Sequence, residues 1–155
     1  MRILPIAALL SLFTFVACKS TSCCSPVGTC EQSQATVEKV AKEHPGLTRL
    51  TVHCMMDGKP MACASTAADK KGKPSDAEDV KAMQSGQPVV LDEQGLLDVT
   101  VPILAKDGKF HGACGVTMPT TGMTREQAVA KATSIAKAVE AGLPACCMTG
   151  CSTGK

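Results

Sequence analysis

Two Asp-Gly-Lys triplets, at residues 57–59 and 107–109, most constrain how this 155-residue chain can fold. Asp-Gly favours the tight turn of a β-hairpin, and β-branched and apolar runs flank each triplet. Gly95 marks a further turn, and strands joined by such short turns run antiparallel. The pattern therefore predicts an antiparallel sheet of five strands, at residues 48–56, 61–66, 89–92, 96–104 and 109–118.

Segments with a helical period lie before, between and after these strands. An apolar stripe that begins after Glu31 predicts an N-terminal helix, which Pro45-Gly46 ends. Capping boxes that start at Ser75 and Thr124 predict a short middle helix and a long C-terminal helix. The expected fold class is α+β, with a five-stranded antiparallel sheet and three helices over residues 31–143.

The first residues have the pattern of an export signal. A positive start, an apolar run and a small-residue end predict a signal peptide over residues 1–17. The sequence Phe-Val-Ala-Cys before and at Cys18 is similar to a bacterial lipobox, so we expect lipidation of Cys18, with cleavage without lipid as the alternative. Residues 18–30 form a Cys/Ser-rich tether and residues 144–155 a Cys-rich tail. The expected location is the periplasm or the outer envelope.

Charge and aromatic content exclude several classes of function. Sixteen basic residues oppose fourteen acidic ones, and the net charge of +2 gives no electrostatic footprint for nucleic acid. Beyond the expected signal peptide the only aromatic residue is Phe110, so base-stacking platforms and aromatic cages are excluded. The sequence also lacks the nucleophile-elbow, phosphate-loop and His-Glu-x-x-His motifs, so we expect no enzyme.

Several motifs together resemble a single Cache domain, the PAS-like extracytoplasmic sensor fold. They are the two Asp-Gly-Lys hairpins, Gly-Lys-Pro-Ser-Asp at 72–76, Val-Thr-Val-Pro-Ile at 99–103 and Gly-Ala-Cys-Gly-Val-Thr at 112–117. The resemblance covers residues 31–143 and implies the strand order 2-1-5-4-3, with a small-molecule pocket between the sheet and its helices. Cache domains usually belong to transmembrane kinases or chemoreceptors, whereas these residues include no output module.

Polar residues on the strands are the candidates for ligand binding. Asp98 and Thr100 alternate with an apolar set, so they share the opposite face, which is either solvent-exposed or the floor of a ligand site. The implied strand order places His53 and His111 on adjacent strands, where they would line a pocket or hold ordinary hydrogen bonds. Lys73 belongs to a basic loop that overlies the pocket in Cache-like domains, or is simply solvated.

Ten cysteines indicate an oxidising compartment or a soft metal. The cysteines of the two tails favour disulfides over a metal site, because their spacing fits no zinc motif. A turn centred on Gly58-Lys59 would put Cys54 directly opposite Cys63, and the implied order adds Cys114 on the neighbouring strand. These three are the candidate Cu or Zn ligands, with core packing or a disulfide as the alternative.

The sequence therefore predicts an extracytoplasmic, envelope-anchored, non-catalytic module that binds a small molecule and reports to a membrane partner protein. The alternative is an envelope protein that binds Cu or Zn, or buffers thiols, through its clustered cysteines and methionines.

Overall fold

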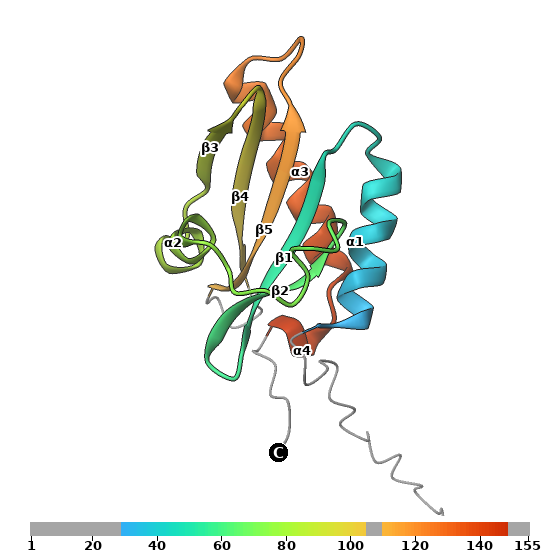
Figure 1. Ribbon diagram of the computed structural model, residues 1–155, viewed down its shortest axis with the longest axis vertical. Helices are drawn as coiled ribbons and strands as arrows, with labels where there is room; N and C mark the ends of the chain where they lie inside the picture. The colour runs from blue at the N-terminus through green and yellow to red at the C-terminus, as the bar shows by residue number, and fades with distance from the viewer. Residues whose placement is uncertain (1–28, 105–109, 149–155) are drawn as a thin grey trace, which may run out of the picture.

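In the computed structural model, which describes residues 29–104 and 110–148, five strands form one antiparallel sheet with helices on both faces (Figure 1). The strands are β1 (Arg49–Met56), β2 (Lys59–Ser65), β3 (Val89–Glu93), β4 (Leu96–Leu104) and β5 (Phe110–Pro119). The helices are α1 (Glu31–Glu43), α2 (Ala77–Ser85), α3 (Arg125–Gly142) and α4 (Ala145–Met148). The strand order β2-β1-β5-β4-β3 confirms the predicted fold class and order.

One face of the sheet is apolar and forms the main core. Because side chains alternate along a strand, every second residue of β1 and β4 faces this core. The buried residues are Leu50, Val52, Cys54 and Met56 on β1, and Leu97, Val99, Val101 and Ile103 on β4. Helices α1 and α3 lie side by side over this face (Figure 1). The inner stripe of α3 is mostly alanine, so the helix packs close to the strands.

The opposite face of the sheet is polar and is covered by α2. A small apolar cluster of Ala82, Met83 and Ala113 fixes the C-terminal half of α2 against β5. The segment before α2 runs along β2: the amide of Ala62 donates to the carbonyl of Lys73 over 2.9 Å, and Gly72 donates back to Ala62 over 2.8 Å. This segment covers the outer edge of β2 and pairs backbone groups that an edge strand would otherwise expose.

The register of the first hairpin differs from the expectation. Asp57 and Gly58 both take positive φ values, 47° and 76°, and Met56 pairs with Lys59. The turn is therefore centred on Asp57-Gly58, which places Cys54 opposite Met61 rather than Cys63. The pairing shifts by one residue between Val52 and His53, and Cys63 is the extra residue of this bulge.

One helix boundary also differs, and one short helix was not predicted. Helix α2 is capped by Asp76, not Ser75, and the amide of Asp76 donates to the carboxylate of Asp79 over 3.0 Å. The predicted tail over residues 144–155 begins with the short helix α4, which starts directly after Pro144, a residue suited to a helix start.

The predicted signal peptide over residues 1–17 and the predicted lipidation of Cys18 lie outside the described residues. Within the described part of the chain, no helix has both the length and the apolar character that crossing a bilayer requires.

Two glycines of β5 provide a test of this packing. A Cβ at Gly112 would lie 2.5 Å from the carbonyl oxygen of His53, whereas at Gly115 its nearest atom would be 3.7 Å away. We expect Gly112→Ala to lower the free energy of unfolding by about 1–3 kcal/mol, because β1 and β5 must separate. Urea denaturation of both variants measures this. Equal stability of Gly112→Ala and Gly115→Ala would contradict the β1–β5 register.

Candidate functional site

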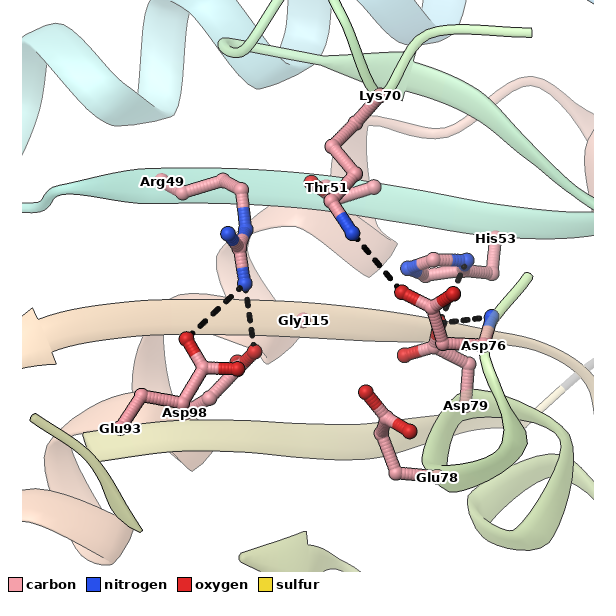
Figure 2. A pocket seen from close by; sticks show the side chains of 10 residues that line it. All are labelled: Arg49, Thr51, His53, Lys70, Asp76, Glu78, Asp79, Glu93, Asp98 and Gly115. Carbon is pink, nitrogen blue, oxygen red and sulfur yellow. Dashed lines mark hydrogen bonds and ion pairs between the residues drawn. The ribbon is translucent and has the colours of Figure 1, made fainter. Parts of the chain in front are cut away.

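A cavity of about 60 Å³ lies on the polar face, between the sheet and α2 (Figure 2). Its walls come from β1, β3, β4 and β5, from the loop before α2, and from the first turn of α2. The lining residues are Arg49, Thr51, His53, Lys70, Asp76, Glu78, Asp79, Glu93, Asp98 and Gly115. Almost all of these side chains are polar or charged, so the cavity is a polar site within an otherwise enclosed face.

An ion pair crosses the floor of the cavity. Arg49 Nη2 on β1 lies 2.8 Å from Asp98 Oδ2 on β4 and 3.7 Å from Glu93 Oε2 on β3 (Figure 2). The Asp98 side chain is only 9% exposed, and its other oxygen, Oδ1, is buried and accepts no hydrogen bond from any described residue. A buried carboxylate oxygen without a donor costs free energy, so this atom is available for a ligand.

His53 forms the wall of the cavity beside Asp98. Its Nδ1 lies 2.9 Å from Ser75 Oγ and 3.3 Å from Asp79 Oδ2. Burial lowers the pKa of His53 to about 4, against the opposing effect of Asp76 and Asp98. The imidazole is therefore neutral at pH 7, so its 3.3 Å contact with Asp79 is not an ion pair.

Asp79 fastens the first turn of α2 to the sheet. Its Oδ1 accepts a hydrogen bond from Thr100 Oγ1 on β4 over 3.1 Å, and its Oδ2 accepts from the backbone amide of Asp76. Burial raises the pKa of Asp79 to about 6, although both hydrogen bonds favour the charged form. Asp79 is therefore mostly ionised at pH 7 and becomes protonated in mildly acidic solution.

Lys70 lies at the rim of the cavity. Its Nζ is 2.9 Å from Asp76 Oδ2, and this hydrogen bond raises the pKa of Lys70 (Figure 2). Both cations of the lining, Arg49 and Lys70, thus already contact carboxylates. Five carboxyl groups line the cavity against these two cations, so the site is acidic overall.

The structure separates the sequence-predicted ligand residues. His53 and Asp98 line the cavity, and Thr100 adjoins it through its bond to Asp79. Lys73 is exposed and is not among the lining residues, whereas Lys70 of the same basic run is one of them. His111 belongs to β5, but its side chain lies outside the described part of the structure.

Sequence reasoning missed Arg49 and Asp79. Arg49 has the same strand parity as Thr51 and His53, so its position on the polar face was available from the alternation of β1. Asp79 sits in the first turn of a helix, where an acidic residue is ordinary helix chemistry, and no local signal distinguishes it.

Ser75, His53 and Asp79 are the residue types of a hydrolase triad, but their geometry is different. A triad needs the serine at one ring nitrogen and the carboxylate at the other, so that the ring passes a proton between them. Here Ser75 and Asp79 both lie at Nδ1. The three residues therefore do not have the order of a triad.

The three central cysteines lie on the core face, away from the cavity. Cys54 and Cys63 form a disulfide with a Cα–Cα distance of 5.9 Å, and Cys114 is fully buried in the same core cluster. The disulfide removes two of the three proposed metal ligands as thiolates. Within residues 29–104 and 110–148, no group of three or more His, Cys, Asp or Glu side chains is arranged to hold a metal ion.

A second sulfur pair joins the two ends of the described chain. Cys30 Sγ and Cys147 Sγ are 3.1 Å apart, and Ser33 Oγ lies 3.2 Å from the first and 3.0 Å from the second. The contact with Cys147 lowers the pKa of Cys30 to about 5. This buried cluster ties the start of α1 to α4. The other tail cysteines, 18, 23, 24 and 151, lie outside the described residues, as does the side chain of Cys146.

Comparison with known proteins identifies the fold. No protein-family model and no curated protein matches the chain. Among solved structures, the GAF domain of an Acinetobacter phosphoenolpyruvate-protein phosphotransferase has a TM-score of 0.52 at 13% identity, covering 72% of this chain and 79% of that chain. A GAF domain/HD domain protein from Geobacter sulfurreducens has a TM-score of 0.51 at 10% identity, covering 71% and 88%. A type II free methionine-R-sulfoxide reductase from Thermoplasma acidophilum has a TM-score of 0.50 at 14% identity, covering 73% and 93%.

These likenesses concern the fold alone, and they indicate a GAF-like fold. The resemblance to a Cache domain is wrong: its motifs are hairpin turns and β-branched runs that any antiparallel sheet of this order needs. The Cache resemblance therefore no longer supports an extracytoplasmic sensor, and these likenesses give no indication of export or of a lipid anchor.

The two buried titrating groups give a prediction about stability and pH. His53 is neutral in the fold down to about pH 4, so between pH 4 and 6.5 only the unfolded chain binds its proton, and stability rises with pH. Asp79 keeps its proton in the fold up to about pH 6, so between pH 3.8 and 6 stability falls as pH rises. The two contributions, each about 3 kcal/mol, oppose one another in the wild type.

We therefore expect Asp79→Asn to make the free energy of unfolding rise more steeply from pH 4 to 6 than in the wild type. His53→Gln should make it fall relative to the wild type over the same range. Urea denaturation at several pH values measures both slopes, and Asp92→Asn, on the other face of the sheet, should keep the wild-type slope. A shift of both variants in the same direction would contradict the assignment.

The cysteine states give a further prediction. Burial raises the pKa of Cys114 to about 12, so iodoacetamide at pH 8 should label it only after denaturation. Trypsin does not cleave Lys59–Pro60, so Cys54 and Cys63 should remain in one peptide, residues 50–70, that is about 2 Da lighter before reduction. Mass spectrometry checks both, and alkylation of Cys54 and Cys63 in the native, unreduced protein would contradict the disulfide.

Proposed function

We propose that this protein is a non-catalytic module that binds a small molecule in the cavity between the sheet and α2. The observation that carries the proposal concerns Asp98, which lines the cavity and whose buried Oδ1 accepts no hydrogen bond from any described residue. Native structures satisfy almost all buried polar atoms, and an exception at a cavity is a mark of a binding site.

The position of the cavity supports a binding role. Four strands and the first turn of α2 contribute to its lining, and Asp79 joins α2 to β4. A ligand would therefore change the interactions of α2 with the sheet. By analogy of fold alone, such a change would be read by a second protein or domain that contacts α2.

A reductase function is less well supported, although one structural neighbour is a free methionine-R-sulfoxide reductase. None of the described residues that line the cavity is a cysteine, and the Cys54–Cys63 disulfide and Cys114 lie on the core face. The geometry of His53, Ser75 and Asp79 does not form a proton relay. Binding without chemistry is the function that the site supports best.

A larger space of about 420 Å³ is a weaker candidate. Among the described residues its lining comes from a single stretch of α3, Arg125 to Ala130, so one helix surface bounds it. A specific small-molecule site encloses most of its ligand, which one helix surface does not do.

A thermal-shift screen tests the proposal. We expect one chemical class among small amines, amino acids, organic acids and nucleotides to raise the melting temperature saturably, by several degrees at 100 times its dissociation constant. Asp98→Asn should abolish the shift. Asp92→Asn is the matched control, because it makes the same charge change on the other face of the sheet, where Asp92 pairs with Arg125. If no class shifts the wild type, or if Asp98→Asn responds as the wild type does, the proposal is wrong.

A further inference from the structure

We propose that the cavity binds the primary ammonium group of a small organic amine, held between Asp98 Oδ1 and His53 Nε2. This inference rests on the proposed function, because it takes the cavity between the sheet and α2 to be the ligand site.

The first argument is the chemistry of Asp98. Its carboxylate is held in place by Arg49 through Oδ2 alone, which leaves Oδ1 buried and without a donor among the described residues. An ionised oxygen can only accept hydrogen bonds, so its missing partner must be a donor. An ammonium N–H supplies that donor and also the opposite charge, and hydrogen bonds of this kind are the stronger ones.

The second argument is the orientation of His53. The neutral ring carries one proton, and its Nδ1 faces the carboxylate oxygen of Asp79 at 3.3 Å. A proton on Nδ1 makes this contact favourable, and Ser75 Oγ can accept as well, whereas a bare Nδ1 would put two acceptors together. With the proton on Nδ1, Nε2 is an acceptor. No described residue hydrogen-bonds Nε2.

The third argument is the space above Gly115. A Cβ at this residue would lie 3.7 Å from His53 Nε2, 3.9 Å from Thr100 Oγ1 and 4.0 Å from Asp98 Oδ1. One position on the floor of the cavity is therefore close to both unused acceptors at once. Because residue 115 has no side chain, a single nitrogen of a ligand can occupy the space beside it and reach both atoms.

The balance of charge gives the fourth argument. The lining carries three more carboxyl groups than cations, and both cations, Arg49 and Lys70, are already paired. An anionic ligand, including the carboxylate of an amino acid, would meet no unpaired cation among these residues. A cationic ligand would lie among carboxyl groups that outnumber the cations, so the lining favours a positively charged ligand.

The volume and lining of the cavity limit which cationic ligands can bind there. About 60 Å³ is the volume of two water molecules, which suits an ammonium with one or two carbons and excludes a nucleotide. None of the lining residues is Phe, Tyr or Trp, so the cage that holds quaternary amines is missing here. The primary amine is the class that fits both size and donor requirement.

The experiment is a titration of the ¹⁵N-labelled protein with ethylammonium chloride, followed by NMR. We expect saturable shifts centred on the amide of Gly115, with a dissociation constant in the millimolar range, since a three-atom ligand can gain little more. Tetramethylammonium chloride, sodium acetate and magnesium chloride at the same ionic strength should not give these shifts. Gly115→Ala, whose methyl group fills the floor with only ordinary contacts, should weaken binding at least tenfold. Asp92→Asn should bind as the wild type does.

The outcomes separate this inference from the proposed function. If an acid or nucleotide binds and Gly115→Ala abolishes it, the cavity is a ligand site but the amine assignment is wrong. If ethylammonium fails and no compound of the wider screen binds, both are wrong. Ethylammonium shifts that Gly115→Ala leaves unchanged, or equal shifts from magnesium or tetramethylammonium, would overturn the assignment to the two acceptors.

Discussion

The ion pair between Arg49 and Asp98 determines the character of the whole polar face. Both residues pair across the backbone with Thr117 of β5, so the two side chains reach toward each other over the central strand. The pair thereby links β1 and β4, which are not neighbours in the sheet. A buried ion pair adds little net stability, because removing two charges from water offsets their attraction. Its consequence here is positional: it fixes one carboxylate oxygen and leaves the other buried without a donor among the described residues.

The sheet shows how one alternating pattern serves two purposes. In β1, the residues Leu50, Val52 and Cys54 build the core, and the residues between them, Arg49, Thr51 and His53, build the cavity. A one-residue slip of β1 would exchange the two sets, so the register carries both stability and site geometry. The Asp57-Gly58 turn fixes that register at one end of the strand.

The sequence was sufficient to predict the elements of the fold, because helix and strand periods, capping boxes and Asp-Gly turns are local signals. Alternation along the fourth strand put Asp98 and Thr100 on one polar face, whereas His53 was a candidate through the strand order that the Cache resemblance implied. Three features of the structure could not be predicted from the sequence, because they depend on contacts between distant residues. They are the bulge at Cys63, the pairing of Arg49 with Asp98, and the position of Asp79 against Thr100. The family assignment failed for the same reason, since hairpin turns and β-branched runs do not distinguish a Cache domain from a GAF-like fold.

Helix α2 is the element through which an occupied cavity would act on the rest of the protein. Its C-terminal half rests on the apolar contacts of Ala82 and Met83, but its first turn is held by polar contacts that converge on Asp79. Burial penalises the charged form of Asp79, so in the empty cavity these contacts hold a carboxylate that is costly to ionise. A cation in the cavity favours the charged form, which accepts hydrogen bonds from Thr100 and Asp76 more strongly than the neutral form does. Because coupling between two equilibria is reciprocal, an ammonium that strengthens the attachment of α2 must bind more tightly when α2 is attached.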